Sequence, residues 1–564
     1  MKILLAYPPC LDPRFSSQDA LVTPLGLYYI GALLLDNGYD VEIINFAETE
    51  TKNNNIQKIL FEKKPDILGL SIFNANRWGG IETASIAKEL NSGIKTVFGG
   101  VGATFLWKHF LTHFDYIDYL VIGEGEYSFL NLVKHLEKND AGPPYSINGI
   151  AFRDGEHIHK TDSPEKIHDL DILPLPAKYF DFQHISLMRG CPGKCSFCGS
   201  PEFWGSGSIS SHSSKYFVDQ LEILNKRGIT FFYVSDDTFT LKKAVVIEIC
   251  REIIKRKLDI TWVAISRVDC INEDILYWMR MAGCIQISFG VESGSETIRK
   301  KLGKNINDEK IKNAFSLCTE YGILPRAYFI YGSPGETWNT INQTISLMLL
   351  IKPLALISYL LVVFPGTELY REYKKLKQIT DDIWLEKIED IPWIEAEPKL
   401  STNLAKKFGK KIRKEFHRNL TFFARKIKLV EKEEMHEKHA DFLSRLALTF
   451  SHGDYAFVEK NTDVAEELFE RALRYFPDHR AYLGLGMLLQ KKRDFKKSIE
   501  IIENGILNYS SSEDLHMCIG LSWMNLGKHK KALEYFFKFQ NSEKIASYIA
   551  ECHHALGKSE NESL

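Results

Sequence analysis

The sequence has little cysteine and almost no net charge. Ten cysteines in 564 residues are too few for a disulfide scaffold. The 71 Lys and Arg nearly balance the 73 Asp and Glu, leaving a net charge of −2. No global positive field therefore attracts nucleic acid, and no nucleic-acid partner is expected. With 45% apolar and 26% charged residues, the composition also excludes a largely disordered chain.

Long apolar runs are missing as well. The most apolar stretch, residues 341–364, is interrupted by Asn342, Gln343, Lys352 and Pro353, so we do not expect it to span a membrane. The apolar run at the N-terminus is shorter than the core of a secretory signal. These features predict a cytoplasmic enzyme with several domains, because one domain usually takes about 150 residues.

Residues 1–140 alternate short apolar runs with segments of helical periodicity, which predicts a doubly wound, Rossmann-like α/β domain. Its expected strands end in residues that form turns: Pro8-Pro9, Ser71, Gly99-Gly100 and the run 123–126. Ligands of such sheets bind at these carboxyl ends. The dense prolines of 141–183 then predict a linker.

Residues 184–395 repeat the strand–helix alternation about six times, which predicts a partial (β/α)6 barrel, open on one side. Its expected strands are 184–188, 229–235, 260–266, 284–289, 327–331 and 357–363. Several of them turn abruptly polar at their carboxyl ends. That rim is where barrels of parallel strands assemble their chemistry.

Residues 396–440 are predicted to be a basic helical connector. Ten Lys or Arg stand against one acid, Glu415, between 400 and 430, and apolar residues recur every three or four positions. The pattern indicates either a bridging helix with a solvated face or a contact with a membrane surface or an anionic substrate. A location peripheral to the membrane stays open on this ground.

Residues 441–564 contain a repeat of about 34 residues. Ala465, Ser498 and Ala532 are spaced by 33 and 34 residues, and Gly486 and Gly520 by 34. The segment resembles tetratricopeptide repeats, which are all-α, and small residues at these points would let paired helices approach closely. Such an array implies a groove for a protein partner or for the neighbouring domain.

Three cysteines within eight residues, Cys191, Cys195 and Cys198, lie just after the first barrel strand in a loop with glycine and proline. This spacing is typical of the thiolates that hold iron–sulfur clusters. A structural zinc ion would require a fourth ligand, which no nearby Cys or His pair supplies, and a disulfide is a weaker alternative still. The other seven cysteines stand singly and are interpreted as core or surface thiols: Cys10, Cys250, Cys270, Cys284, Cys318, Cys518 and Cys552.

The Cys-x-x-x-Cys-x-x-Cys motif before a strand–helix barrel resembles the radical S-adenosylmethionine superfamily. The resemblance implies that the three cysteines hold a [4Fe-4S] cluster whose fourth iron binds S-adenosylmethionine. It also implies that Phe197 lies against the adenine and that later strand ends surround the rest of the molecule. The S-adenosylmethionine contacts implied in this way are Phe197, Asp236, Asp237, Ser266, Arg267, Glu292, Ser293 and Gly332.

These strand-end residues also have purely structural interpretations. Asp237 and Glu292 could cap the helices that follow them. Gly332 could simply turn the chain. Beyond the three cluster ligands, no catalytic residue is assigned.

The N-terminal domain resembles the cobalamin-binding domain found in the same superfamily. The cobalamin contacts implied are Pro8, Ser71, Gly99, Gly100, Val101, Glu124 and Gly125. The methionine-synthase type carries Asp-x-His-x-x-Gly after its first strand, whereas here the first histidine of the chain is His109. A lower cobalt ligand from that motif is therefore not expected. The departure also leaves open a packing module without cobalamin.

Together the resemblances imply an anaerobic, cobalamin-dependent radical enzyme, with C-methyl transfer to an unactivated carbon as the preferred interpretation. A 5′-deoxyadenosyl radical would abstract hydrogen, and methylcobalamin would deliver the methyl group. Cyclisation, rearrangement or oxidation without methyl transfer is the first alternative, since the layout also resembles the anaerobic magnesium-protoporphyrin ester cyclase. A repeat-based scaffold with a redox-sensing cluster is the second. The implied partners are a one-electron donor such as flavodoxin or ferredoxin and a substrate that is anionic or lipid-associated.

Overall fold

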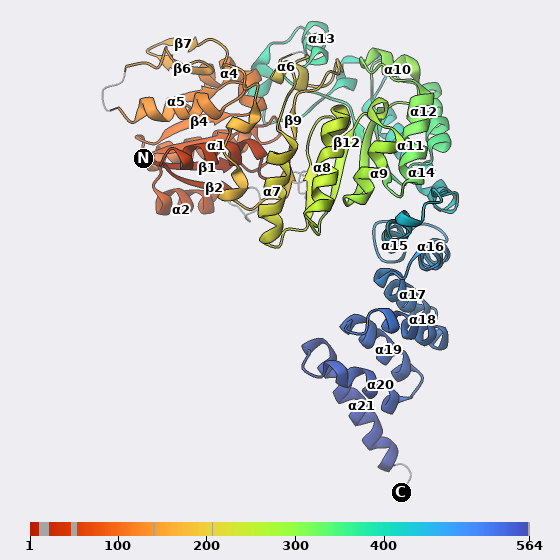
Figure 1. Cartoon of the computed structure of the whole chain (residues 1–564). Helices are drawn as coiled ribbons and strands as arrows, with labels where there is room; N and C mark the ends of the chain where they lie inside the picture. The colour runs from red at the N-terminus through yellow and green to blue at the C-terminus, as the bar shows by residue number, and fades with distance from the viewer. Residues whose placement is uncertain (11–21, 47–52, 139–141, 206, 562–564) are drawn as a thin grey trace.

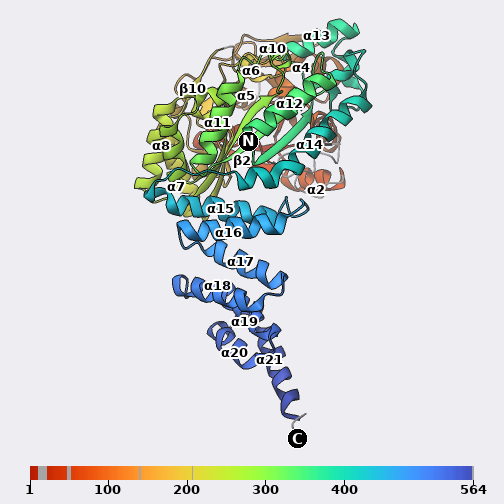
Figure 2. The same cartoon turned by 90° about the vertical axis from the view of Figure 1, so that its right-hand side faces the viewer.

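The computed structural model describes residues 1–10, 22–46, 53–138, 142–205 and 207–561. They form an α/β domain, a second α/β domain built on a six-stranded sheet, and an arm of paired helices (Figure 1). The two α/β domains lie side by side, and the arm extends away from the second one (Figures 1 and 2). The fold class expected from the sequence is confirmed.

The first domain is a seven-stranded sheet in which the first five strands are parallel. Across the sheet the order is β2 (Asp40–Asn45), β1 (Lys2–Tyr7), β3 (Ile67–Ser71), β4 (Lys95–Gly99), β5 (Tyr119–Val121), β6 (Ile150–Asp154) and β7 (His157–Lys160). Strand β3 is buried along its whole length, as a central parallel strand covered on both faces must be.

Five helices cover the two faces of this sheet. One face carries α1 (Leu25–Asp36) and α5 (Glu126–Leu136), and the other carries α2 (Asn53–Lys63), α3 (Arg77–Leu90) and α4 (Val101–His113). The apolar residues of β1 alternate between the two cores, with Leu4 packed on one side and Leu5 on the other. The sheet is thus a doubly wound, Rossmann-like layer.

The segment predicted as a linker, residues 141–183, is partly sheet. Strands β6 and β7 form an antiparallel hairpin that extends the sheet from β5. The prolines that suggested a linker flank this hairpin, whereas Phe152 within it is buried. Gly155, with a φ of +58°, makes its turn. The N-terminal sheet therefore continues past residue 140, and only the short η3 (Leu170–Ile172) and η4 (Pro176–Lys178) follow before the barrel.

The second domain is an open barrel of six parallel strands, as predicted. The order is β8 (His184–Ile185), β11 (Phe231–Val234), β12 (Thr261–Ser266), β13 (Cys284–Glu292), β14 (Leu324–Tyr331) and β15 (Ala355–Leu360). The outer helices are α6 (Ser200–Trp204), α7 (Ser214–Lys226), α8 (Lys243–Lys255), α9 (Glu273–Met281), α10 (Glu296–Lys301), α11 (Asp308–Glu320) and α12 (Trp338–Ile351). Short pieces between them are the ribbon of β9 (Met188–Arg189) and β10 (Ser210–Ser211), η5 (Phe239–Leu241) and η6 (Val268–Cys270).

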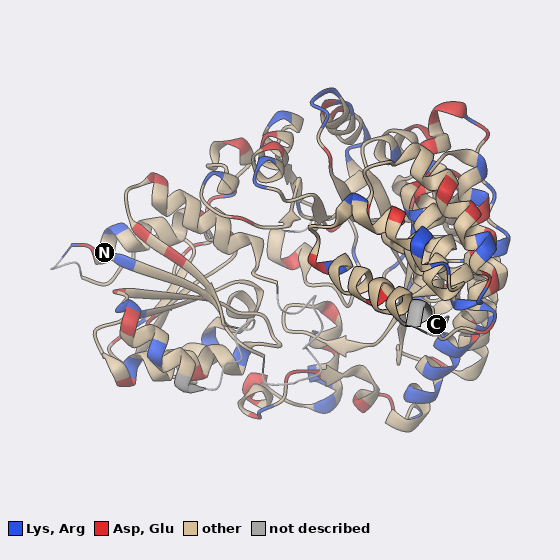
Figure 3. Ribbon diagram, turned by 90° about the horizontal axis from the view of Figure 1, so that it is seen from below, with Lys and Arg blue, Asp and Glu red and all other residues tan. Residues whose placement is uncertain are grey.

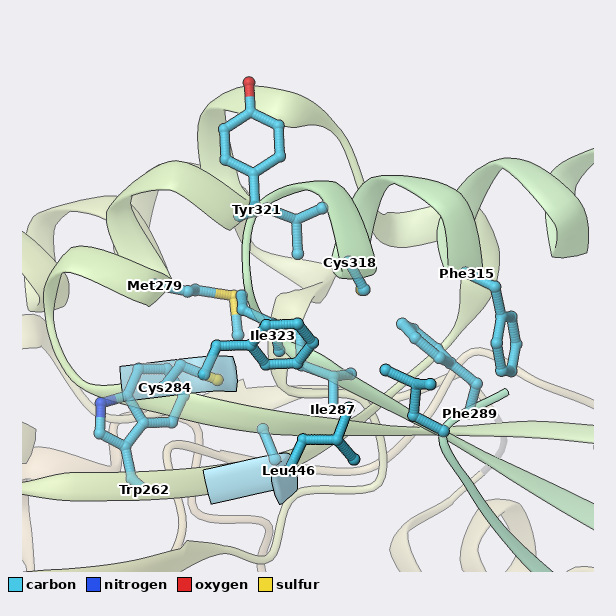
Figure 4. Close-up of a cluster of buried hydrophobic side chains, with 14 of the residues drawn as sticks. Trp262, Met279, Cys284, Ile287, Phe289, Phe315, Cys318, Tyr321, Ile323 and Leu446 are labelled. Atoms are coloured by element: carbon cyan, nitrogen blue, oxygen red, sulfur yellow. The ribbon is translucent and has the colours of Figure 1, made fainter. Parts of the chain in front are cut away.

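The core of the barrel lies between its strands and outer helices (Figure 4). Cys284 and Cys318 pack there among Trp262, Ile287 and Phe289, which confirms their interpretation as core thiols. Of the other single cysteines, Cys250, Cys518 and Cys552 are also buried, whereas Cys10 and Cys270 are half-buried.

After β15 the chain returns to the N-terminal domain. This segment comprises β16 (Val362–Val363), α13 (Glu368–Lys377), η7 (Asp381–Leu385), β17 (Ile391–Pro392) and η8 (Trp393–Ala396). Trp384, fully buried, joins the same core as Phe110 of α4. The two α/β domains therefore share an apolar core at this edge.

The basic connector is the helix α14 (Thr402–Arg425). Its apolar residues are buried, with Phe408 and Ile412 packed beside Tyr331 and Leu360 of the barrel. The basic residues, such as Lys406 and Lys410, are exposed. Seen from below, Lys and Arg alternate with Asp and Glu along the ribbon (Figure 3). Among the described helices, none has the length and apolar character needed to cross a bilayer.

The arm consists of α15 (His436–Ser451), α16 (Asn461–Tyr475), α17 (His479–Lys491), α18 (Phe495–Asn508), α19 (Glu513–Asn525), α20 (His529–Phe536) and α21 (Glu543–Asn561), with η9 (Glu433–Met435) before it and η10 (Phe537–Phe539) within it. Small residues lie at the helix contacts, as expected from the repeat. A Cβ on Gly520 would lie 2.2 Å from Phe536, and one on Gly486 would lie 2.4 Å from Ile502. The all-helical C-terminal part fits the predicted repeats.

Candidate functional site

The cysteine loop, residues 191–198, joins β9 to α6. It begins at Gly190, whose φ is +91° and where a Cβ would lie 2.2 Å from the carbonyl oxygen of Ser208. Only glycine fits at that position. Backbone hydrogen bonds hold the loop: Ser196 donates to the carbonyl of Leu302 at 3.1 Å and accepts from the amide of Leu369 at 2.8 Å. The loop is thus fixed from two sides.

The sulfur atoms of Cys191 and Cys195 both lie close to Gly193. A Cβ on Gly193 would lie 3.3 Å from the Cys191 Sγ and 3.9 Å from the Cys195 Sγ. The Gly193 amide donates to the Cys191 Sγ at 3.4 Å, and the Thr238 Oγ1 lies 3.5 Å from the same sulfur. Amide and hydroxyl groups at these distances can stabilise a thiolate.

Burial shifts the pKa of two of the thiols, Cys195 and Cys198. It raises the pKa of Cys195, and it raises the pKa of Cys198 to about 11, because desolvation disfavours the thiolate. The cations Lys304 and Arg267 act in the opposite direction on Cys195. Three soft ligands in a partly buried loop with cations beside them suit an iron–sulfur cluster, whose positive iron would offset the burial of thiolate charge.

Four of the eight residues implied to contact S-adenosylmethionine lie around this loop. Arg267 approaches Gly193 and forms a two-point ion pair with Asp269, at 3.0 and 2.9 Å. Asp237 accepts a hydrogen bond from Ser200, and its charge contributes to the raised pKa of Cys198. Phe197, inside the loop, packs partly buried against the core shared with the N-terminal domain.

Glu292, the fourth of these residues, ends β13 in a left-handed backbone conformation, with a φ of +64°. Its carboxylate pairs with Lys304 at 3.0 Å, and both side chains are buried. A side chain held in this strained conformation is typical of functional sites. A Cβ on Gly290, two residues before Glu292, would lie 2.4 Å from that carboxylate and 2.7 Å from the Lys304 Nζ, so the ion pair packs against glycine backbone.

The other four residues are engaged with the protein itself. Asp236 is fully buried and accepts hydrogen bonds from the amides of Leu187 and Met188, and burial raises its pKa to about 7. The Ser266 hydroxyl bonds to that of Thr240, the Ser293 hydroxyl to that of Thr344 at 3.2 Å, and the Gly332 amide donates to Glu336 at 2.6 Å. The contact of these four with S-adenosylmethionine stays a prediction.

A cavity of about 630 Å³ lies between the two α/β domains. Six of the seven residues implied to contact cobalamin line it: Ser71, Gly99, Gly100, Val101, Glu124 and Gly125. Pro8, the seventh, packs instead toward Gly80, where a Cβ would lie 3.5 Å from the proline ring. From the barrel, the lining includes His184, Met188, Arg189, Ser235 and Asp237.

The cavity has the character expected for a large planar ligand. At Gly100 the φ is +90° and a Cβ would lie 2.9 Å from the carbonyl of Ile72, so glycine is required there. At Gly99 the nearest described atom to a Cβ is 3.9 Å away, so the backbone is bare. The rings of Tyr7 and Phe73, in edge contact at 6.2 Å, also line the space. Bare glycine backbone with apolar rings fits cobalamin.

Arg189 is the main residue that sequence reasoning missed. Its guanidinium, almost fully buried, pairs with Glu124 at 2.9 Å and with Glu126 at 2.5 Å. It also lies 5.5 Å from the ring centroids of both Tyr29 and Trp204. Both carboxylates are more than 60 positions away in the sequence. The spacing of residues around Arg189 therefore gave no indication of the contact.

His212 was missed for the same reason. Its Nε2 lies 2.9 Å from the Tyr29 hydroxyl and its Nδ1 lies 3.2 Å from an oxygen of Asp171. The ring stacks on Tyr216 with centroids 3.9 Å apart. Burial lowers the pKa of His212 to about 3, so the imidazole is neutral near pH 7.

Comparison with known proteins gives two family matches. The model of the radical SAM superfamily matches residues 185–348, which include the cysteine loop. The model of the B12 binding domain matches residues 17–133, which include the glycines of the cavity.

Two relatives are about 30% identical over more than half of this chain. An uncharacterised methyltransferase of Pyrococcus horikoshii is 31% identical over 357 residues, covering 61% of this chain and 77% of the relative. The anaerobic magnesium-protoporphyrin IX monomethyl ester cyclase of Rubrivivax gelatinosus is 30% identical over 357 residues, covering 59% of this chain and 64% of the cyclase.

Among solved structures, the radical S-adenosylmethionine methyltransferase TsrM of Kitasatospora setae, with cobalamin and a [4Fe-4S] cluster bound, has the same fold. The TM-score is 0.60 at 16% identity, with 84% of this chain and 100% of TsrM covered. The chain therefore belongs to the radical SAM superfamily, as a member with a B12-binding domain whose cofactors are a [4Fe-4S] cluster, S-adenosylmethionine and cobalamin.

Proposed function

We propose that this enzyme is a C-methyltransferase that acts on an unactivated carbon. One observation carries the proposal: the glycine-rich strand ends of the N-terminal domain and the strand ends of the barrel line a single cavity. Asp237, which interacts electrostatically with Cys198 of the cysteine loop, belongs to that lining. A methyl carrier and a radical generator would thus act on a shared space. Relatives named as methyltransferases support the same reaction class.

When bound, the cluster supplies the electron for reductive cleavage of S-adenosylmethionine, and cobalamin supplies a methyl carrier. Cys191, Cys195 and Cys198 would hold the cluster, and Gly99 and Gly100 would let cobalamin approach the backbone.

The residues of the chain position these parts. Asp236 ties the strand end at β11 to the backbone at 187 and 188, just before the cysteine loop. Arg189 of β9, which directly follows Met188, pairs with Glu124 and Glu126 of the N-terminal domain. These buried contacts fix the distance between the loop and the glycine cradle. Fixed geometry is what transfer between two bound groups requires.

The partners and the location are part of the proposal. A radical SAM enzyme needs a reductant, and we assign a one-electron donor of the flavodoxin or ferredoxin class. The exposed lysines of α14 favour a substrate with negative charge, and the arm offers a surface for a protein partner. The three cysteines of the loop and the buried Cys250, Cys284, Cys318, Cys518 and Cys552 are free thiols, which suits a reducing, cytoplasmic environment.

The test uses S-adenosylmethionine labelled in its methyl group, with cobalamin-loaded, cluster-reconstituted enzyme, an extract of small molecules and a reductant. We expect label in a product carbon together with 5′-deoxyadenosine. Cys191→Ala, Cys195→Ala and Cys198→Ala should each abolish formation of 5′-deoxyadenosine, whereas Cys270→Ala should not.

Formation of 5′-deoxyadenosine with an unlabelled product would contradict methyl transfer and favour cyclisation or rearrangement, the reaction class of the cyclase relatives. Formation of 5′-deoxyadenosine by the cysteine variants at the wild-type rate would contradict the assignment of the loop itself.

A further inference from the structure

A cluster of metal-ligating side chains lies outside the cavity and the cysteine loop. His109 and His113 are four positions apart on α4, and Asp382 lies on η7. One ligand atom from each of the three lies within 4.8 Å of the other two. The His113 Nε2 is 3.1 Å from an oxygen of Asp382. None of the three lines the cavity between the domains.

His109 is the member that the fold leaves unsatisfied. Its side chain is only 6% exposed, yet neither Nδ1 nor Nε2 has a hydrogen-bond partner. A buried polar group without a partner costs free energy, so native structures usually supply one. Its ring faces His113, with centroids 5.0 Å apart. A group that bound the His109 nitrogen would therefore also lie within reach of the ligand atoms of His113 and Asp382.

We propose that His109, His113 and Asp382 bind a divalent transition-metal ion, with Zn²⁺ the best match. Two imidazole nitrogens and one carboxylate oxygen are a ligand set that zinc uses, with water completing four-coordination. Two histidines one helical turn apart project from the same helix face, so α4 presents both to one ion. Calcium and magnesium prefer all-oxygen ligands and fit this set poorly.

The surroundings permit such an ion. Asp381 and Asp382 contribute negative charge at His109, while Arg77 and His113 contribute the opposite sign. Arg77 is engaged elsewhere, since it donates to the carbonyl of Ile388 at 2.6 Å and lies over the ring of Trp384. The side chains of His113 and Asp382 are 28% and 64% exposed, which gives an ion a path from solvent.

The position of the site defines its role. Helix α4 starts at Val101, immediately after the Gly99-Gly100 cradle, whereas η7 lies beyond the last barrel strand. An ion held by both would tie the segment after the barrel to the helix that follows the cradle. This role is structural and does not depend on the reaction proposed above.

The test measures zinc bound to the full-length enzyme after its cluster has been reconstituted, by equilibrium dialysis at about 1 µM free Zn²⁺ followed by elemental analysis. We expect one zinc ion per chain, with nitrogen and oxygen but no sulfur ligands in its X-ray absorption spectrum. His109→Ala and Asp382→Asn should each weaken binding by about a hundredfold or more. The exposed Asp382 serves as the second variant, because its substitution should leave the fold intact.

Matched controls separate this site from others. His157→Ala and Asp40→Asn change an exposed histidine and an exposed aspartate elsewhere in the same domain and should retain the zinc. The Cys191→Ala, Cys195→Ala, Cys198→Ala triple variant should also retain it. Absence of bound zinc, sulfur ligands in the spectrum, or unchanged binding in both His109→Ala and Asp382→Asn would overturn the proposal.

Discussion

The barrel forms two junctions. At its junction with the N-terminal domain, residues of both domains enclose a cavity of about 630 Å³. At its junction with the arm, residues of the barrel and of the arm form one continuous apolar core. Each junction also contains a charge cluster, which is mostly buried at the first and partly exposed at the second. Arg189 lies between two carboxylates at the first. Asp441 of α15 lies among three arginines at the second: Arg280, Arg445 and Arg480.

The difference indicates that the first junction binds ligands, whereas the second holds the barrel and the arm together. At the first, glycines and a few rings leave space, and the ion pairs of Arg189 maintain the distance between two domains. At the second, Leu443, Leu446 and Phe450 of α15 fill the space beside the barrel helices, so nothing can enter. A substitution of similar size should therefore affect cofactor binding at one junction and stability at the other.

A substitution that fills the cavity should have the largest effect, which is a loss of cobalamin binding. Gly99→Val adds a side chain where only bare backbone faces the space, so we expect cobalamin to bind at least about a hundredfold more weakly. The cluster and the formation of 5′-deoxyadenosine should persist. Cobalamin absorbance after gel filtration measures the loss, with Gly557→Val as control because no described atom lies within 4 Å of a Cβ there. Retention of cobalamin by Gly99→Val would refute the placement of the cofactor.

Removing the Arg189 guanidinium at the first junction should have the second-largest effect, on stability and on methyl transfer. Arg189→Met leaves Glu124 and Glu126 buried without a counter-ion, which should lower the free energy of unfolding of this part by about 3–5 kcal/mol. Methyl transfer should fall as well, because the two domains lose their fixed distance. Urea unfolding and product assays test both expectations. Arg227→Met, which breaks an exposed pair with Asp181, should cost less than about 1 kcal/mol.

At the second junction, Asp441→Asn should lower stability by about 2 kcal/mol and leave the rate per bound cofactor unchanged. The three arginines lower the pKa of Asp441 to about 2, against 3.8 for an ordinary aspartate. The stabilising charge is therefore present above pH 4 and is lost as the pH falls toward 2. The difference in stability between wild type and variant should shrink over that interval. A pH-independent difference would show that packing, not charge, is responsible.

The smallest effect is expected from an exposed ion pair beside the same junction. Arg425 of α14 contacts Glu467 of α16 through two nitrogens, and both side chains are well exposed. Arg425→Gln should change the unfolding free energy by less than about 1 kcal/mol, and the change should vanish in high salt. A larger effect, measured by urea unfolding at two salt concentrations, would mean that surface charge and not the apolar core joins the arm to the barrel.

Features formed by residues close together in the sequence could be predicted, whereas contacts between domains could not. The cysteine loop was readable because its three ligands lie within eight residues, and the glycines of the cradle because each ends an apolar strand. Arg189 with Glu124 and Glu126 could not be found, since the partners meet only through the packing of two domains. Asp236 occupies a strand end, as a ligand contact would, but the nearby backbone amides of 187 and 188 engage its carboxylate.

Composition misled at one point of the fold. The prolines between 141 and 183 are concentrated on either side of the β6–β7 hairpin, and an average over the segment hid the apolar run that forms β6. The sequence analysis did not identify the cluster of His109, His113 and Asp382, because only tertiary structure brings Asp382 to the two histidines.

The shared core of barrel and arm decides where this chain can be shortened or fused to another protein. A truncation before residue 436 would strip α15 from the barrel and expose the apolar residues that it covers, so the shortened enzyme should aggregate. The helices from α18 onward belong to separate, smaller clusters. The arm can therefore be cut, or replaced by another module, only beyond α17, and its first helices must be inherited together with the catalytic domain.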